Sequence, residues 1–416
     1  MIDDKLIDIV IERLISRIED TNTYILQEIG NSIKQIRDIT PSKRHQLIQI
    51  LKYGENYQDI LNKLSKMTNL NLKDIKDIFK EVSKKDLNFA KNFYEYRNIP
   101  FVKYAENDTL KRQTMALANL TKREMYNFTR SRALGYTIRD LKGIPRFYGL
   151  RETYERVLDE AVLNVGQGKD TFDSAMTRIM KDIGGSGLKT VEFESGRSIR
   201  LDSAVRMHLK GGLRELHNEN QKLFGEEFGA DGVEISVHQN PAPDHEKAQG
   251  RQFSTVKPSK NELSEWEKLQ KGKDAKDYKG NTYNLDHDHK NGYRPISEYN
   301  CYHYIFSIVL GVSEPEYSDE QLQKIINDND KGFEFEGKHY SNYDGNQLQR
   351  SIERAIREQK DIQIFAKNGG NMKLVGECQQ KITQLTNKYK KLSDISGLPT
   401  KMQRLKVSGY RRTRIK

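Results

Sequence analysis

The chain has 416 residues, which is long enough for two or three domains that each bury a core of their own. Hydrophobic residues make up 35% of it and charged residues 31%, a composition typical of a soluble, helix-rich protein with modest cores and not of a compact apolar enzyme. With 70 basic and 59 acidic residues the formal net charge is +11, which favours a polyanionic partner such as double-stranded DNA, bound nonspecifically through its phosphates.

Residues 1–187 form the first predicted region, which we expect to consist of amphipathic helices. Ile29, Ile33 and Ile36 recur at spacings of four and three residues, which places them on one helix face. The same region starts with MIDDKLIDIV, whose acidic residues do not fit the basic start of a signal peptide. Breaks between its helices are expected near three prolines, Pro41, Pro100 and Pro145.

A small α+β core is predicted over residues 188–315, preceded by a hinge at Gly184–Gly187, GGSG. In TVEFESGRSIRL, apolar residues alternate on both sides of Ser195–Gly196, which indicates a β-hairpin. Asp202 follows the hairpin, and we expect it to cap a helix that reaches about Phe224.

The second half of this core is predicted to contain two buried strands and a surface insertion. Alternating Val233, Ile235 and Val237 indicate a strand that becomes a proline-rigid loop at His238. The lysine-rich residues 256–293 are expected to be a polar insertion at the surface. NCYHYIFSIVLGVSEP then predicts a buried apolar element that ends near Gly311, and this run is too short to span a bilayer. We therefore expect no membrane partner.

Residues 316–400 are predicted to form helices, and residues 401–416 a basic tail. In NQLQRSIERAIREQK, Ile352 and Ile356 share one helix face, and the tail carries seven basic residues and no acidic one. These cations are the candidate nucleic-acid contacts, with solvated basic surfaces as the alternative interpretation. The candidates are Arg350, Arg354, Arg357, Lys401, Arg404, Lys406, Arg411, Arg412, Arg414 and Lys416.

Five of the nine histidines lie between His238 and His303, close to Cys301. One hypothesis is a structural zinc site, because imidazole and thiolate are ligands that zinc prefers. Its candidate ligands are His238, His245, Cys301 and His303. The alternative is a set of hydrogen-bonded side chains that fix a loop without any cofactor, and we expect this one because no CxxC pair is present. The chain has one other cysteine, Cys378, so we expect a reducing compartment and no disulfide framework.

A second alternative function comes from LDHDHKNGYRPISEYNC, residues 285–301, which is similar to the core of endonuclease VII-like HNH nucleases. In such a metal-dependent DNA endonuclease, Asp286, His287 and His289 would act at the scissile phosphate. Those nucleases carry paired cysteines around the core, and the upstream pair is missing in this chain. We therefore expect a protein that is not an enzyme.

Four stretches resemble the tailed-phage minor capsid protein 2 family, related to the Mu-type head morphogenesis proteins. They are GLKTVEFESGRSIRLDSAVRMHLKGGLRELH, DGVEISVHQNPAPDHEKAQGRQFS, NCYHYIFSIVLGVSEPEYS and NQLQRSIERAIREQK. The resemblance covers residues from about Tyr154 to Gly409, with one departure at Ala242, where the family pattern has arginine. The pattern falls on His238, Pro243, Asp244, His245, Gln249, Gly250, Asn300, Cys301, His303, Gln349, Arg350, Glu353, Arg354 and Arg357.

The resemblance implies a predominantly α-helical α+β protein of the virion. Such a protein would be built into the prohead near the portal in the host cytoplasm and would be part of the phage head. Its partners would be the portal protein, other capsid proteins and packaged DNA. The resemblance also implies that His238 and His245 meet Cys301 and His303 where the loop docks on the second segment.

Overall fold

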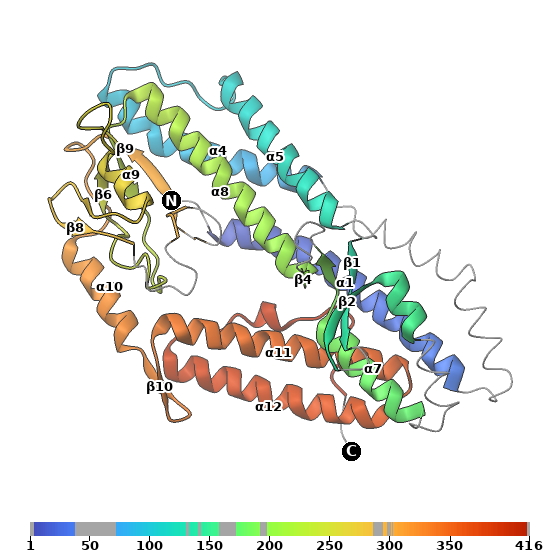
Figure 1. Ribbon diagram of the computed structural model, residues 1–416. Helices are drawn as coiled ribbons and strands as arrows, with labels where there is room; N and C mark the ends of the chain where they lie inside the picture. The colour runs from blue at the N-terminus through green and yellow to red at the C-terminus, as the bar shows by residue number, and fades with distance from the viewer. Residues whose placement is uncertain are drawn as a thin grey trace. The chain divides into compact units, whose positions relative to one another are not determined.

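The computed structural model confirms a predominantly helical α+β fold (Figure 1). It describes residues 4–37, 72–129, 133–139, 143–157, 172–191, 198–285, 294–297, 301 and 303–413. Among the described helices, none combines the length and the apolar character that a bilayer crossing requires.

The chain divides into two compact units, each assembled from three separate stretches of sequence. Unit 1 contains residues 1–7, 72–121 and 209–347, and unit 2 contains residues 8–71, 122–208 and 348–416. These units therefore differ from the four consecutive regions that we expect from the sequence, because residues far apart in the chain share one core.

Unit 1 contains helical segments that pack through aromatic side chains. They belong to α4 (Leu72–Tyr96), α5 (Asp108–Thr129) and α8 (Leu201–Phe228). The predicted break at Pro100 is confirmed, since it lies between α4 and α5. Phe93 of α4 stacks on Phe228 of α8 at 4.9 Å between ring centroids. Buried polar groups cross-link the same helices, because His217 Nδ1 lies 2.8 Å from Asp86 Oδ1.

A three-stranded antiparallel sheet lies in the same unit, with β5 (Gly232–Ile235) at its centre. Its neighbours are β6 (Gln252–Ser254) and β9 (Ile305–Ile308). The strand predicted at Val233 and Ile235 is confirmed, although it ends before Val237. The buried apolar element is β9, and Gly311 follows it with a φ of +76°. The sheet thus brings residues 236–251 beside the residues that precede β9.

Most of residues 256–285 in the predicted polar insertion are exposed, but the segment also contains regular elements and buried side chains. These residues form α9 (Glu265–Gln270), β7 (Ala275–Lys276) and β8 (Thr282–Tyr283). Leu269, Ala275 and Leu285 are fully buried in one core cluster with Val233 and Phe253 of the sheet. Lysines cover the outside of this segment. Because charged and polar residues outnumber its apolar residues, the composition of the segment does not reveal that some of its side chains are buried.

Unit 1 ends in α10 (Asp319–Lys331) and a short hairpin of β10 (Phe333–Phe335) and β11 (Lys338–Tyr340). Ser318 starts α10 with a capping box, because its hydroxyl accepts from Gln321 N while the Gln321 side chain accepts from Ser318 N.

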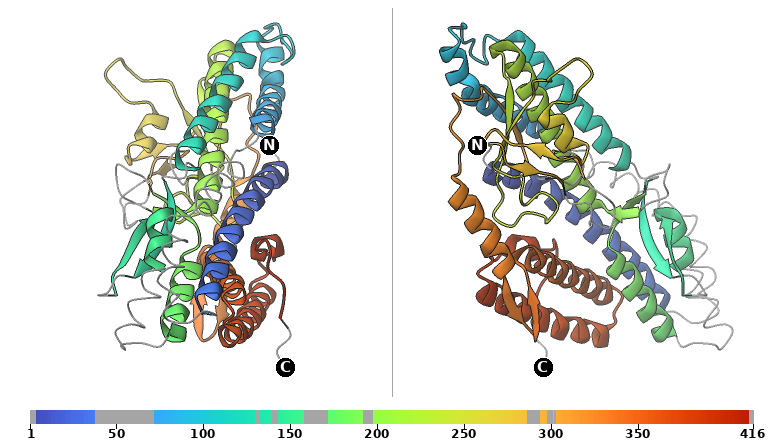
Figure 2. Two further views of the ribbon diagram at one scale, coloured as in Figure 1. Left: turned by 90° about the vertical axis from the view of Figure 1, so that its right-hand side faces the viewer. Right: turned by 60° about the vertical axis from the view of Figure 1, so that its left-hand side comes forward.

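Unit 2 is built on long helices, of which α11 (Asn342–Asn368) and α12 (Met372–Ser396) lie side by side (Figures 1 and 2). Helices were predicted over residues 316–400, with Ile352 and Ile356 on one face of α11, and both helices are confirmed. The long helix α1 (Asp4–Arg37) contributes Ile29 and Ile33 to the core of this unit, as expected.

A four-stranded antiparallel sheet of order β2-β1-β3-β4 completes unit 2. The predicted hairpin is confirmed as β3 (Lys189–Val191) and β4 (Ser198–Arg200). The expectation that residues 1–187 consist of helices alone is wrong, because β1 (Leu134–Arg139) and β2 (Pro145–Gly149) form a second hairpin.

The GGSG stretch is not a hinge between elements, because Gly184 to Ser186 form the end of α7 (Phe172–Ser186). A Cβ on Gly184 would lie 2.7 Å from the Cα of Ile362, so the glycine permits close approach of α7 and α11. Asp202 lies in the first turn of α8 and pairs with Arg200 and Arg357 instead of capping the helix.

Candidate functional site

The loop after β5 returns to β6 through a left-handed glycine. Gly250 has a φ of +68°, and its N–H donates to the Ile235 carbonyl at 2.8 Å. A Cβ here would meet Leu322 and Val237 atoms at 2.6 and 2.9 Å, so this turn requires glycine. The tight return places His245 inside unit 1, where its side chain is buried.

An ion pair ties this loop to the segment that precedes β9. Arg294 donates from Nε and Nη2 to the two oxygens of buried Asp244 at 2.7 and 2.8 Å. Such a bidentate pair fixes direction as well as distance. The carboxylate from the predicted motif therefore positions a second chain segment beside the loop, and the described residues of this segment are 294–297, 301 and 303.

Further contacts hold that second segment in place. Gln270 and Ile296 exchange two hydrogen bonds of 2.8 and 3.0 Å, which link it to α9. Arg214 of α8 donates to the Cys301 carbonyl at 2.7 Å. The backbone around Cys301 is thus fixed from two sides.

Two imidazoles and a thiol meet at the junction of the loop and the segment. Cys301 Sγ lies 3.5 Å from His245 Nδ1 and 3.4 Å from His303 Nδ1. All three residues are buried, and one ligand atom of each lies within 4.8 Å of the others. Among the described residues, this is the group of His, Cys, Asp or Glu side chains whose geometry could hold a metal ion.

The outer nitrogens of both histidines face oxygen acceptors. His245 Nε2 lies 2.7 Å from the Arg294 carbonyl oxygen, and His303 Nε2 lies 3.4 Å from Gln249 Oε1. If each Nε2 carries the proton, each Nδ1 presents its lone pair to Cys301. Burial, with His238 and His245 nearby, lowers the pKa of His303 well below its usual value, so its ring is neutral.

The remaining motif residues surround this cluster. The half-buried His238 ring lies edge-on to His303, with centroids 4.6 Å apart, and its backbone N–H donates to Gln249 Oε1 at 2.8 Å. Pro243 is exposed beside the loop. Asn300 and the HNH-like residues Asp286, His287 and His289 lie outside the described residues.

Sequence reasoning missed Arg294, Arg214 and Gln270, which hold the cluster in place. Arg294 lies within the HNH-like stretch, so its nearness to candidate ligands was a usable signal. Nothing in the sequence points to Arg214 or Gln270, because their partners are backbone groups that only the fold brings near.

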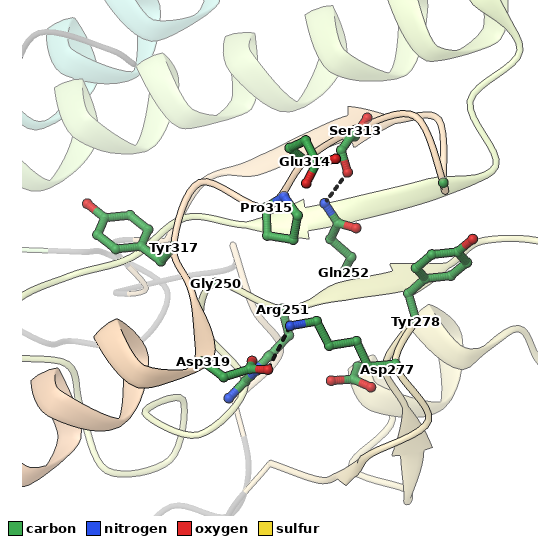
Figure 3. A pocket seen from close by; sticks show the side chains of 12 residues that line it. Gly250, Arg251, Gln252, Asp277, Tyr278, Ser313, Glu314, Pro315, Tyr317 and Asp319 are labelled. Carbon is green, nitrogen blue, oxygen red and sulfur yellow. Dashed lines mark hydrogen bonds and ion pairs between the residues drawn. The ribbon is translucent and has the colours of Figure 1, made fainter.

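A pocket of about 230 Å³ lies on the other side of Gly250, between β6 and the turn after β9 (Figure 3). Figure 3 shows Arg251 reaching Asp319 and Gln252 reaching Ser313. Lys279 also pairs with Asp319 at 2.7 Å. Because its cations already pair with a carboxylate, the pocket has little positive charge to offer a phosphate.

The candidate DNA contacts of unit 2 fall into two groups. Arg357 pairs with Asp202, and its side chain is 14% exposed, so we set it aside as a contact for phosphate. Arg404 lies 3.9 Å from Glu353 and is 18% exposed. Lys401 and Arg350 are half-buried, and Arg414 and Lys416 lie outside the described residues. The exposed candidates are Arg354, Lys406, Arg411 and Arg412.

The predicted basic tail lies along α11 as an ordered strap, which we define as residues 399–413. Gln349 donates to the Pro399 carbonyl, Lys360 to the Leu405 carbonyl, and Gln363 to the Thr413 hydroxyl. The strap also buries Leu405. Its exposed cations are therefore held in fixed positions on unit 2.

The comparisons with known proteins agree with the resemblance noted in the sequence. The family model described as phage minor capsid protein 2 matches residues 2–394. Neither a curated protein nor a solved structure matches the chain. Because the family model spans nearly all of the sequence, including the buried cluster, the chain belongs to the phage minor capsid protein 2 family.

Proposed function

We propose that this phage minor capsid protein is built into the prohead near the portal and contacts packaged double-stranded DNA through the strap of unit 2. The family match over residues 2–394 carries the proposal that it acts as a structural part of the head. The portal location rests on the resemblance to head morphogenesis proteins. The DNA contact rests on the charge of the chain and on the exposed cations of the strap.

The charge argument favours contact with phosphates over recognition of bases. A net charge of +11 attracts a polyanion from a distance, and fixed cations near the surface release counterions on contact. Lys406, Arg411 and Arg412 are exposed on a strap that is anchored by side chains of α11. Such an arrangement binds DNA without regard to sequence.

Charge reversal on the strap tests the DNA contact. In the variant Lys406→Glu, Arg411→Glu, Arg412→Glu, we expect weaker binding to a random-sequence duplex and a smaller dependence on salt. Each phosphate contact contributes about 0.9 to the slope of log affinity against log salt concentration, so the slope falls by up to about 2.7. Fluorescence anisotropy across a salt series measures both quantities.

The matched control reverses three exposed lysines of α12, Lys381, Lys390 and Lys391, and changes the net charge equally. Equal losses of affinity and slope in the two variants would mean that only overall charge matters, and would contradict a contact at the strap.

Cross-linking in proheads tests the location near the portal. We expect lysine cross-links from this protein to the portal protein in proheads isolated before packaging, identified by mass spectrometry. Cross-links confined to major capsid protein far from the portal vertex would overturn that part of the proposal. The nuclease alternative rests on Asp286, His287 and His289, and it stays a prediction from the sequence.

A further inference from the structure

We propose that His245 Nδ1, Cys301 Sγ and His303 Nδ1 bind one zinc ion, which closes the loop after β5 onto the segment before β9. The three side chains are buried in unit 1 and come from chain positions 56 and 2 residues apart. The proposal concerns the folding of unit 1 and is independent of the strap and of DNA.

The two sulfur–nitrogen separations fit tetrahedral zinc. Zinc bonds of about 2.3 Å to sulfur and about 2.0–2.1 Å to nitrogen place the two ligand atoms about 3.6 Å apart at a tetrahedral angle. The measured separations of Cys301 Sγ from the two Nδ1 atoms are 3.5 and 3.4 Å. An ion therefore fits with small movements of side chains.

The groups behind the ligands direct both imidazoles inward. In metal sites the outer ring nitrogen of a histidine donates to a carbonyl or carboxylate, which fixes the tautomer and the ring. His245 Nε2 faces the Arg294 carbonyl, and His303 Nε2 faces the Gln249 amide oxygen. Arg294 is itself held by Asp244, so this outer layer reaches back into the loop.

Two backbone N–H groups point at the sulfur of Cys301. Its sulfur accepts backbone N–H groups from Ser297 at 3.2 Å and from His303 at 3.4 Å. Burial raises the pKa of the thiol above its usual value, and these hydrogen bonds, together with Arg214 and Arg294, offset only part of that rise. The thiolate that zinc requires would therefore form when the metal binds.

A cluster without metal explains the same geometry less well. With both Nε2 atoms protonated, two Nδ1 lone pairs face one thiol, which has one proton to donate. One sulfur–nitrogen contact would then bring two acceptors together in a buried site, which is unfavourable. A zinc ion accepts all three electron pairs. The expected hydrogen-bonded cluster is thus the alternative that the experiment must separate.

Three protein ligands leave the fourth position of the tetrahedron to water, which is the arrangement of open zinc sites and not of closed structural ones. His238 adjoins the cluster, and its ring lies edge-on to His303. The ion would link chain segments that the sheet already aligns, so its expected effect is on stability. Trp266 packs against the core cluster that contains Cys301, and it is the one tryptophan of the chain.

Metal analysis of the full chain, purified without a histidine tag, tests the proposal. We expect about one zinc per chain, retained or regained on addition of zinc chloride, because metal binding is linked to folding. Cys301→Ser and His303→Gln should each lose the ion. Cys378→Ser alters the other buried thiol, which lies in unit 2, and should keep it.

Two further readouts keep the test decisive if a ligand variant fails to fold. Chelation should lower the melting temperature of the unaltered protein, followed by Trp266 fluorescence. Cobalt substitution should give a thiolate charge-transfer band and the d–d bands of tetrahedral cobalt. The proposal is overturned if zinc neither copurifies nor binds at stoichiometric amounts when added, or if chelation leaves the unfolding of unit 1 unchanged.

Discussion

Replacing Arg200 with alanine should destabilise unit 2 by about 3–5 kcal/mol, the usual cost of leaving a buried charge without its partner. Arg200 lies 3.4 Å from Asp361 and 3.2 Å from Asp202, and the two carboxylates are 1% and 8% exposed. Asp202 keeps Arg357, whereas Asp361 loses its ion pair. Urea denaturation followed by circular dichroism measures the loss.

The control for this variant is an exposed ion pair of unit 2. Arg151 and Glu155 lie 3.0 Å apart, with exposures of 68% and 35%, so Arg151→Ala should cost below about 0.5 kcal/mol. The double variant Arg200→Ala, Asp361→Asn should recover part of the loss, because no buried charge is stranded. If the double variant is no more stable than Arg200→Ala, the cost comes from lost packing and not from charge.

Glu19→Gln is expected to make the protein more stable than the unaltered chain at pH 8, and equally stable at pH 4. Burial and nearby Asp202 raise the pKa of Glu19 to about 8 from 4.5, with smaller effects of Arg357, Asp361 and Glu12. The folded state therefore holds a proton that the unfolded state has lost between pH 4.5 and 8. Folding stability falls as the pH rises through this range.

The difference between the two proteins isolates this one group. Asp361, whose pKa burial raises to about 6, and Asp202, whose pKa Arg200 and Arg357 lower, are present in both and cancel to first order. A shift from 4.5 to about 8 corresponds to at most about 5 kcal/mol at high pH. If the stability curves of Glu19→Gln and the unaltered protein run parallel from pH 4 to 8, Glu19 has the same pKa in the folded and unfolded states, which contradicts the prediction.

The sequence predicts those parts of the fold in which a local pattern coincides with burial. Ile352 and Ile356 mark the face of α11 that is buried, and Val233 and Ile235 mark β5. The β1–β2 hairpin was missed because a helical region was extended across it. Leu269 and Ala275 were missed because the lysines around them dominate the composition of that segment.

In the candidate site, too, the sequence indicates which residues take part but not which distant residues they contact. Residue chemistry and the family pattern pointed to His245, Cys301 and His303, and the structure brings them together. Arg357 has the helical spacing of a surface cation, yet it faces Asp202, which lies 155 residues earlier in the chain. Periodicity gives the face of a helix, but not which faces of other elements it meets.

The strap has a consequence for the order in which the two units are completed during synthesis. Its Ser408 accepts a hydrogen bond at 2.7 Å from Thr23 of α1, and Gly409 lies against the same threonine. All segments of unit 1 have been synthesised once residue 347 has left the ribosome. Unit 2 contains α1 from the start of the chain, but the last strap contact in this unit forms only after residue 413 has emerged. A slow or truncated final stretch of translation would therefore prolong the time in which α1 and α11 lack their contacts with the strap, and an incomplete unit favours aggregation of the nascent chain over assembly.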